Sequence, residues 1–150
     1  MKKAAKRIEI KNKKAQFEYF LLDEFTAGLV LTGSEIKSIR EGKASIAEAY
    51  CAIYQGEVYV KNMHIAEYRH GGYANHDPKR DRKLLLSRRE IKRLTVKTVE
   101  KGLTIVPLLL FISESGYAKL NIAIAKGKKF YDKRDSIKSR DIERDASRQL

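Results

Sequence analysis

The side chains best suited to chemistry in this sequence are cations and aromatic rings that alternate near its C-terminal end. Five lysine and arginine side chains surround Phe130 and Tyr131 in the stretch AKGKKFYDKR, residues 125–134. Cations neutralise the phosphates of a nucleic acid and exposed rings stack on its bases, so the stretch fits a nucleic-acid contact. A solvated basic surface is the alternative, with the two rings packed on the folded domain.

The rest of the sequence is also basic. Its 32 Lys and Arg against 19 Asp and Glu give a formal net charge of +13, more than a small domain needs for solubility. Residues 2–14 hold seven cations and one anion, residues 79–93 eight and two, and residues 126–134 five and one. Three such clusters on one small domain favour a polyanionic partner over a generic solvated face.

No pattern typical of a catalytic or metal centre accompanies these cations. His64, His70 and His76 recur every six residues, which is not a chelating spacing, and Asp77 beside His76 would complete only a weak site. The sequence has no glycine-rich phosphate loop, nucleophile elbow or paired-carboxylate motif. Cys51, the single cysteine, lies in the strand-like segment AYCAIY, where a thiol behaves as a small apolar side chain. We therefore expect no enzymatic activity, no metal and no cofactor.

The compartment is predicted from what the N-terminal end lacks. The segment MKKAAKRIEIKNKK has no apolar centre like that of a signal peptide, and no apolar run in the chain approaches membrane-spanning length. One cysteine cannot form an internal disulfide. We expect a cytoplasmic monomer that binds no membrane.

Alternating hydrophobicity predicts a mainly β protein. The segments on either side of Gln55-Gly56 and of residues 114–116 are each predicted to form an antiparallel hairpin, and Pro107 predicts a bulge or edge. Another strand is predicted to begin at Phe17. Four of its aromatic side chains are expected in the core, with stacking of one of them on a base as the alternative: Phe17, Tyr19, Phe20 and Phe25.

Two helices are predicted at the margins of these strands. Capping boxes at Thr32–Glu35 and Ser87–Glu90 indicate where they begin, and Gly42 and Gly102 where they end. About six strands without a helical crossover between neighbours predict a small closed or partly closed barrel with flanking helices. Residues 64–87, rich in Gly, Asn, Asp and charge, are predicted to be a long surface loop.

The hydrophobic pattern stops after Arg134. The last residues are predicted to be a basic tail that is disordered when free and becomes helical on a partner, because Ile142, Ala146 and Leu150 recur every four residues. We therefore expect a barrel domain with a basic N-terminal arm over residues 1–131 and a tail over residues 132–150.

Three stretches together resemble one known family. They are NKKAQFEYFLLDEFTAGLVLTGSEIKSIREGKASI from Asn12, DPKRDRKLLLSRREI from Asp77 and AKGKKFYDKRDSIKSRD from Ala125. In order and spacing they are similar to the SsrA-binding protein (small protein B, SmpB) family, the partner of transfer-messenger RNA (tmRNA) in bacterial ribosome rescue. The resemblance implies an OB-like β-barrel whose surface binds the tRNA-like domain of tmRNA.

The resemblance also implies which side chains contact RNA. Matched by motif, these are Asn12, Lys13, Lys14, Thr26, Arg40, Lys43, Arg82, Lys83, Lys126, Lys128 and Lys129. Thr26 stands where the family usually has glutamate. For Arg40 and Lys43 the alternative is that they balance the negative end of a helix.

For the tail, the resemblance implies a contact with the stalled ribosome. The tail would enter the decoding centre of the small subunit and the empty mRNA channel, both walled by ribosomal RNA, and become helical there. Delivery of tmRNA for trans-translation would then occur only on ribosomes whose mRNA channel is empty. The residues implied are Tyr131, Asp132, Lys133, Arg134, Ile137, Lys138, Arg140, Ile142 and Arg144.

Two other functions remain open on the sequence. A generic ribosome-associated RNA-binding protein with an OB barrel would share the charge and the fold but have no dedicated RNA. An RNA hydrolase would need a carboxylate or histidine constellation, which the sequence lacks.

Overall fold

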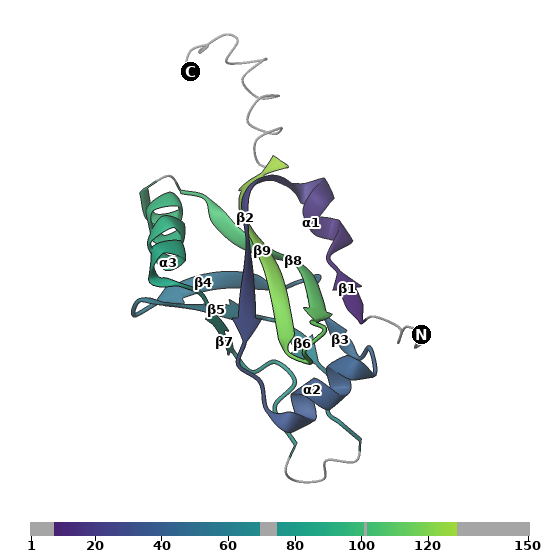
Figure 1. Ribbon diagram of the computed structural model, residues 1–150. Coiled ribbons are helices and arrows are strands. Elements are labelled where there is room, and N and C mark those ends of the chain that lie inside the picture. The colour runs from purple at the N-terminus through teal and green to yellow at the C-terminus, as the bar shows by residue number, and fades with distance from the viewer. Residues whose placement is uncertain (1–7, 70–74, 101, 129–150) are drawn as a thin grey trace, which may run out of the picture.

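A computed structural model describes residues 8–69, 75–100 and 102–128 (Figure 1). Most of them form strands, with helices at the margins. In chain order the elements are β1 (Glu9–Lys11), α1 (Lys13–Glu18), β2 (Tyr19–Leu29), α2 (Gly33–Arg40), β3 (Ala44–Ser45), β4 (Tyr50–Tyr54), β5 (Glu57–Lys61), β6 (His64–Ile65), β7 (Arg82–Leu85), α3 (Arg88–Thr95), the π-helical turn η2 (Val96–Glu100), β8 (Thr104–Ile112) and β9 (Ala118–Gly127).

Seven strands form a sheet that closes on itself. The order is β1-β8-β4-β5-β7-β2-β9, all neighbours are antiparallel, and β9 also pairs with β8. The ring encloses a core of aliphatic side chains that includes Val58, Leu84 and Ile122. The predicted small barrel is therefore confirmed. A separate pair, β3 with β6, lies beside it.

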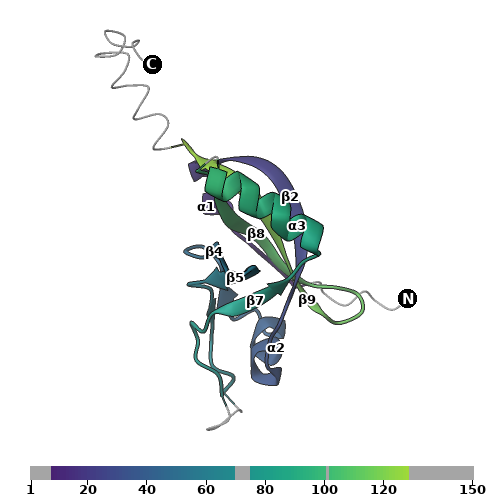
Figure 2. The same cartoon turned by 90° about the vertical axis from the view of Figure 1, so that its left-hand side faces the viewer.

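The helices lie at the edges of the barrel. Figure 1 shows α2 at its lower end and α1 and α3 on opposite sides of its upper half. In the turned view of Figure 2, α3 lies across the upper part of β2 and β8. Arg93 of α3 donates to the Asp23 carboxylate of β2 at 2.6 Å, which ties the helix to that strand. Within the described residues, no helix is both long and apolar enough to cross a membrane.

Both predicted hairpins are present. β4 pairs with β5 from Tyr50↔Lys61 to Tyr54↔Glu57, and the two residues between them, Gln55 and Gly56, have φ of 50° and 77°. Positive φ at both positions is the geometry of the turn that matches strand twist, and glycine adopts it without strain. The pairing of β8 with β9 shifts register after Pro107, so the predicted bulge is confirmed as well.

Capping boxes begin the two predicted helices. The Thr32 hydroxyl accepts from the Glu35 backbone N–H at 3.3 Å, while the Glu35 carboxylate accepts from the Thr32 N–H at 2.8 Å. Ser87 and Glu90 make the same two hydrogen bonds. Both predicted starts are confirmed. The two glycines predicted to end these helices, Gly42 and Gly102, both have positive φ. The second helix continues through η2 before it reaches its glycine.

The predicted start of the first long strand was wrong. Residues 13–18 form α1, and Phe17 on this helix is 79% exposed. Asn12 begins the helix because its side-chain oxygen accepts from the Ala15 N–H at 3.2 Å. Phe20, on β2, is also 41% exposed. The expectation of a core position therefore fails for these two rings, while the other two, Tyr19 and Phe25, are half-buried.

The prediction of one long surface loop at residues 64–87 was also wrong. Ile65 on β6 is fully buried, and β7 lies in the barrel wall between β5 and β2. Leu84 of β7 pairs with Val58 on one side and Leu29 on the other. The strand is short and begins with a charged residue, Arg82, so its alternation gave a weak signal.

A buried ionic network fixes β7 against α2. The Glu35 side chain is fully buried and accepts from Arg80 Nη2 at 2.7 Å and from Arg82 Nε at 2.8 Å. Arg82, also fully buried, donates its other N–H groups to the carbonyls of Met63, at 2.6 Å, and of Asp77 and Pro78. A buried charge is tolerated only when it is paired and hydrogen-bonded in this way.

We predict that Glu35→Gln lowers the free energy of unfolding by about 3–5 kcal/mol, because it leaves two guanidinium groups without their anion, one of them fully buried. Urea unfolding followed by circular dichroism measures the change. The matched control is Glu48→Gln, which removes an exposed ion pair with Lys14. Equal, small effects of both substitutions would contradict the structural role of the network.

Candidate RNA-binding surface

The structure divides the predicted RNA contacts into exposed and buried side chains. Asn12 and Arg82 are buried. Lys129 and all nine predicted tail residues, from Tyr131 to Arg144, lie outside the described residues. The remaining predicted contacts are exposed or half-buried: Lys13, Lys14, Thr26, Arg40, Lys43, Lys83, Lys126 and Lys128.

One group of cations and rings gathers where β9 meets the start of β2. The register of the two strands places Phe20 opposite Lys126 and Tyr19 opposite Gly127. Lys128 Nζ lies 5.2 Å from the centre of the Phe20 ring and donates to the Gln16 carbonyl of α1 at 3.2 Å. Rings and lysines about 110 residues apart in sequence thus meet at the surface. Together with two exposed side chains of α1 that are four residues apart on that helix, Lys13 and Phe17, we call them the α1–β9 cluster: Lys13, Phe17, Phe20, Lys126 and Lys128.

This cluster has the chemistry of a nucleic-acid contact. An exposed ring offers a face to a base, and a lysine beside it offers a charge to the neighbouring phosphate. Sequence reasoning found the lysines but expected Phe17 and Phe20 in the core. The exposure of Phe17 follows from α1, which turns its ring outward, so only recognition of the Asn12 cap could have revealed it. Phe20 is exposed on β2.

A second exposed region lies on the outer face of β2, β9 and β7. The Thr26 hydroxyl donates to the Asn121 side-chain oxygen at 2.8 Å. Gly28 pairs with Lys119 on one side and Leu85 on the other, and Leu85 is 54% exposed. Sequence reasoning missed Asn121, Lys119 and Leu85. Their signal was the strand alternation, which directs the middle leucine of the LLL run outward.

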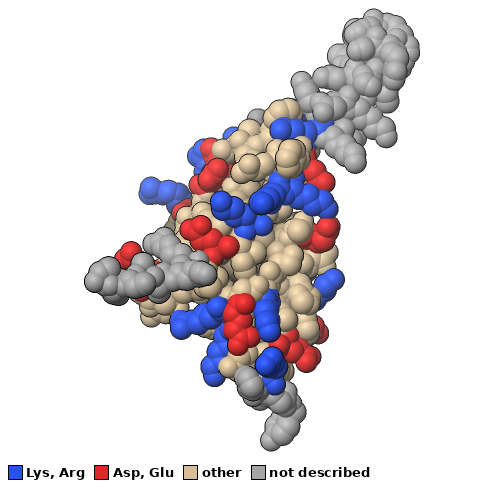
Figure 3. All heavy atoms as spheres, turned by 90° about the vertical axis from the view of Figure 1, so that its right-hand side faces the viewer, with Lys and Arg blue, Asp and Glu red and all other residues tan. Residues whose placement is uncertain are grey.

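Arg40 and Lys43 do not join the α1–β9 cluster. They lie at the end of α2, and Arg40 Nη2 reaches the carbonyl of Gly116 in the β8–β9 turn at 3.5 Å. Gly116 precedes Lys126 by ten residues, most of them in β9, a length of roughly 30 Å. Figure 3 shows lysine and arginine at both ends of the visible face, with acidic side chains among them.

Three of these cations have anionic partners. Lys43 Nζ lies 3.6 Å from a Glu41 carboxylate oxygen two residues away, and the other two pairs join different segments of the chain. Lys14 Nζ lies 2.8 Å from a Glu48 carboxylate oxygen, and this hydrogen bond raises the pKa of the lysine. Lys83 lies 3.7 Å from Glu57. Both pairs are at the surface, where such bridges are weak, so a phosphate can replace the carboxylate.

Arg82 was predicted to contact RNA, and its burial contradicts this. Its guanidinium is enclosed by Glu35 and by three backbone carbonyls. Burial lowers its pKa, and the hydrogen bond and charge of Glu35 oppose that effect. The positive charge of Arg82 is therefore neutralised by Glu35 inside the fold. In the RDRK motif, Lys83 is the cation that remains accessible to RNA.

Asn12 is corrected in the same way. Its amide group donates to the Pro107 carbonyl at 2.8 Å and to the Ile46 carbonyl at 3.3 Å, while its oxygen caps α1. All these atoms are buried, so Asn12 positions the neighbouring Lys13 and does not itself face a ligand.

Two of the side chains considered for catalysis, His76 and Cys51, are buried in the fold. His76 is buried, with Nδ1 2.9 Å from the Ser34 hydroxyl and Nε2 2.9 Å from the Ile65 carbonyl. Burial raises the pKa of the Cys51 thiol and so disfavours the reactive thiolate. Over the part of the chain that the structure describes, no three His, Cys, Asp or Glu side chains gather as metal ligands.

A comparison with protein families decides what this basic barrel is. A family model described as SmpB protein matches residues 9–150, nearly the entire chain. The chain belongs to the SmpB family. The resemblance seen in three sequence stretches is therefore confirmed.

Relatives of the same family cover the chain from end to end. The SsrA-binding protein of Parabacteroides distasonis is 56% identical over 146 residues, which are 97% of this chain and 95% of the relative. That of Phocaeicola vulgatus is 57% identical and covers 94% of each chain. The SsrA-binding protein of Wolbachia pipientis is 53% identical over 91% of this chain and 92% of its own.

A solved structure gives the same fold. One chain of "tmRNA-SmpB: a journey to the center of the bacterial ribosome" superposes with a TM-score of 0.68 at 43% identity. The match covers 81% of this chain and 85% of that chain. The barrel with flanking helices is thus the SmpB fold.

The buried acid of this SmpB barrel makes its stability depend on pH. Burial alone raises the pKa of Glu35, but hydrogen bonds from Arg80, the Thr32 backbone and Arg82 outweigh it and lower the pKa to about 2 from an ordinary 4.5. The stability that the ionised carboxylate provides is therefore complete above about pH 4.5 and is lost as the pH falls toward 2.

We predict that the difference in unfolding free energy between the wild type and Glu35→Gln shrinks over this acid range, because protonation removes the same charge as the substitution. Urea unfolding of both proteins at a series of pH values measures the difference, and effects shared by the other carboxylates cancel. A difference that stays constant down to pH 2 would show that Glu35 is not the titrating group.

Proposed function

We propose that this protein is the RNA-binding adaptor that binds the tRNA-like domain of tmRNA and delivers it to stalled ribosomes for trans-translation. The observation that carries the proposal is identity of 56–57% with proteins named SsrA-binding protein over at least 94% of the chain. The solved SmpB structure is named for tmRNA and the bacterial ribosome. Both partners are therefore assigned to this protein.

The α1–β9 cluster is the proposed centre of RNA binding on the barrel. Its exposed rings and lysines fit unstacked loop bases and the phosphates next to them. Thr26, with Asn121 and Leu85, extends this surface along the outer face of β2. Lys14 and Lys83 contribute after exchanging their carboxylate partners for phosphate. Arg40 and Lys43 at the far end fit a backbone contact with a large folded RNA.

We propose that the barrel binds tmRNA and that the tail binds the ribosome. The last described residue, Lys128, belongs to the α1–β9 cluster, and the tail follows it in the sequence. Lysines and arginines of the tail would meet ribosomal RNA in the decoding centre and the empty mRNA channel. Occupancy of that channel by a message would exclude the tail and so restrict delivery to stalled ribosomes.

The proposed role is non-catalytic and cytoplasmic. Proteins of this family bind RNA, and binding alone accounts for the exposed cations and rings. The ribosome as a partner implies the cytoplasm. A generic ribosome-associated protein would bind tmRNA and ordinary tRNA equally, so competition between the two RNAs separates that function from the one proposed.

We predict that Lys13→Glu with Lys126→Glu weakens binding to a transcript of the tRNA-like domain and reduces the slope of log K against log salt by about 2, one for each lost phosphate contact. Filter binding across a salt series measures both. The matched control is Arg89→Glu with Lys97→Glu, the same charge change on α3 and η2. If the control has the same effect, only net charge matters and the cluster is not the site.

We further predict that a chain ending at Lys129 keeps its affinity and preference for tmRNA but no longer supports tagging of stalled chains, because only the tail contacts the ribosome. The measurements are RNA binding and tagging in a reconstituted translation reaction. Normal tagging by the truncated protein would refute the role of the tail without affecting RNA binding by the barrel.

A further inference from the structure

A groove on the α3 side of the barrel is separate from the α1–β9 cluster. It lies between the β4–β5 turn, β7 and the beginning of α3, and has a volume of about 660 Å³, within the usual range of small-ligand sites. Figure 1 shows α3 and α1 on opposite sides of the barrel. The groove is lined by Gly56, Glu57, Lys83, Leu85, Leu86, Arg88, Ile91 and Lys92.

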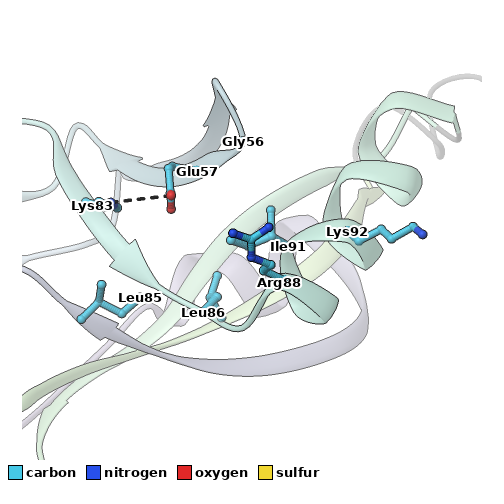
Figure 4. Close-up of a pocket in the computed structure, with 8 residues that line it drawn as sticks. All are labelled: Gly56, Glu57, Lys83, Leu85, Leu86, Arg88, Ile91 and Lys92. Carbon is cyan, nitrogen blue, oxygen red and sulfur yellow. Dashed lines mark ion pairs between the residues drawn. The ribbon is translucent and has the colours of Figure 1, made fainter.

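The floor of the groove is apolar. Leu86 and Ile91 are half-buried and pack against the barrel core from below. Figure 4 shows both side chains pointing into the space between the β4–β5 turn and α3. Leu85 stands at the edge and remains exposed. Covering the apolar floor with a flat, weakly hydrated group removes apolar surface from water, which is favourable.

The rim of the groove carries a net positive charge, because Glu57 is paired with Lys83 at 3.7 Å and the other charged lining residues are Arg88 and Lys92. Arg88 and Lys92 are four residues apart on α3 and both line the groove; in Figure 4 the Arg88 side chain turns toward the floor, whereas Lys92 extends in the other direction. Within the described residues neither makes an ion pair, and the nearby Glu90 carboxylate is held by the Ser87 N–H of the capping box. Figure 4 shows the Arg88 side chain beside Ile91, so charge and apolar floor are adjacent.

We propose that this groove binds one unpaired nucleotide of the RNA, with its phosphate on Arg88 and Lys92 and its base on Leu86 and Ile91. The inference rests on the proposed RNA-binding function and adds a second contact to it. A phosphate offers charge-assisted hydrogen bonds to the two cations, and a base offers the apolar floor a flat ring. An acidic peptide would satisfy the cations but leave the apolar floor exposed.

The contact is tolerant of base identity. The floor offers leucine and isoleucine carbons, which touch any base, and the cations recognise the phosphate common to all nucleotides. The groove therefore selects an extruded nucleotide over a paired one, because a base inside a helix cannot reach the floor.

The first test is nuclear magnetic resonance of the full chain, titrated separately with AMP and with inorganic phosphate. AMP is expected to shift the methyl signals of Leu86 and Ile91 and the amide signals at Arg88, whereas phosphate shifts only the amides. Arg88→Glu with Lys92→Glu should weaken AMP binding by roughly tenfold. The control Arg89→Glu with Lys97→Glu carries the same charge change outside the groove and should bind AMP as the wild type does.

Three results would overturn the inference. Equal binding of AMP and phosphate without methyl shifts would show that the groove binds the anion alone and does not contact the base. Equal loss in the groove variant and its control would reduce it to a net-charge effect. Methyl shifts that follow protein concentration in the absence of nucleotide would show that a second copy covers the floor.

The same variants distinguish this inference from the proposed function. Wild-type protein that fails to prefer tmRNA over tRNA refutes the function. Strong preference that is unchanged by Arg88→Glu with Lys92→Glu, together with unshifted Leu86 and Ile91 methyl signals in the RNA complex, refutes only the groove. Thermal unfolding of each variant confirms that these exposed substitutions leave the barrel folded.

Discussion

The ionic contact between Glu35 and the guanidinium groups of Arg80 and Arg82 is the constraint on which the rest of the structure depends. Glu35 caps α2 and at the same time holds the first residue of β7, so one carboxylate joins a helix, a strand and the segment before it. Because β7 lies between β5 and β2, its position decides whether the ring of strands closes. Burial of these charges is costly, and the backbone carbonyls around Arg82 are what make it tolerable.

Closure of the barrel brings together the surfaces that are proposed to bind RNA. The long pairing of β2 with β9 brings the end of β9 against the start of β2, and α1 adds Phe17 and Lys13 to the same place. Charge that is scattered in the sequence becomes local in this way, while Arg40 and Lys43 stay at the other end. A folded RNA is large enough to reach several of these sites, whereas a small anion would meet only one. The separate basic sites are therefore consistent with a tRNA-like partner.

Cations in this protein do two different kinds of work. Arg82 and Arg80 stabilise the fold, because their guanidinium N–H groups donate to Glu35 and to backbone carbonyl oxygens. Lys14 and Lys83 hold weak surface pairs that a phosphate can displace, and Arg88 and Lys92 line the groove beside α3 without an ion pair in the described part of the chain. A net charge of +13 therefore overstates the charge available to RNA. The burial of each side chain, and not the count, decides which charges can bind.

Local patterns in the sequence determined the barrel class, the two hairpins, the bulge at Pro107, both capping boxes and the family, because each depends on residues close together in the chain. The sequence also predicted Lys13, Lys126 and Lys128 as exposed cations. Only the tertiary structure decided that Asn12 and Arg82 face inward, that Phe17 and Phe20 face outward, and that residues 82–85 form a wall strand. These outcomes depend on partners such as Pro107, Glu35 and Met63, which lie from 19 to 95 residues away along the chain. Charge and periodicity in the sequence predict the type of each element and the charge that it carries. The contacts of each side chain depend on how distant segments pack together.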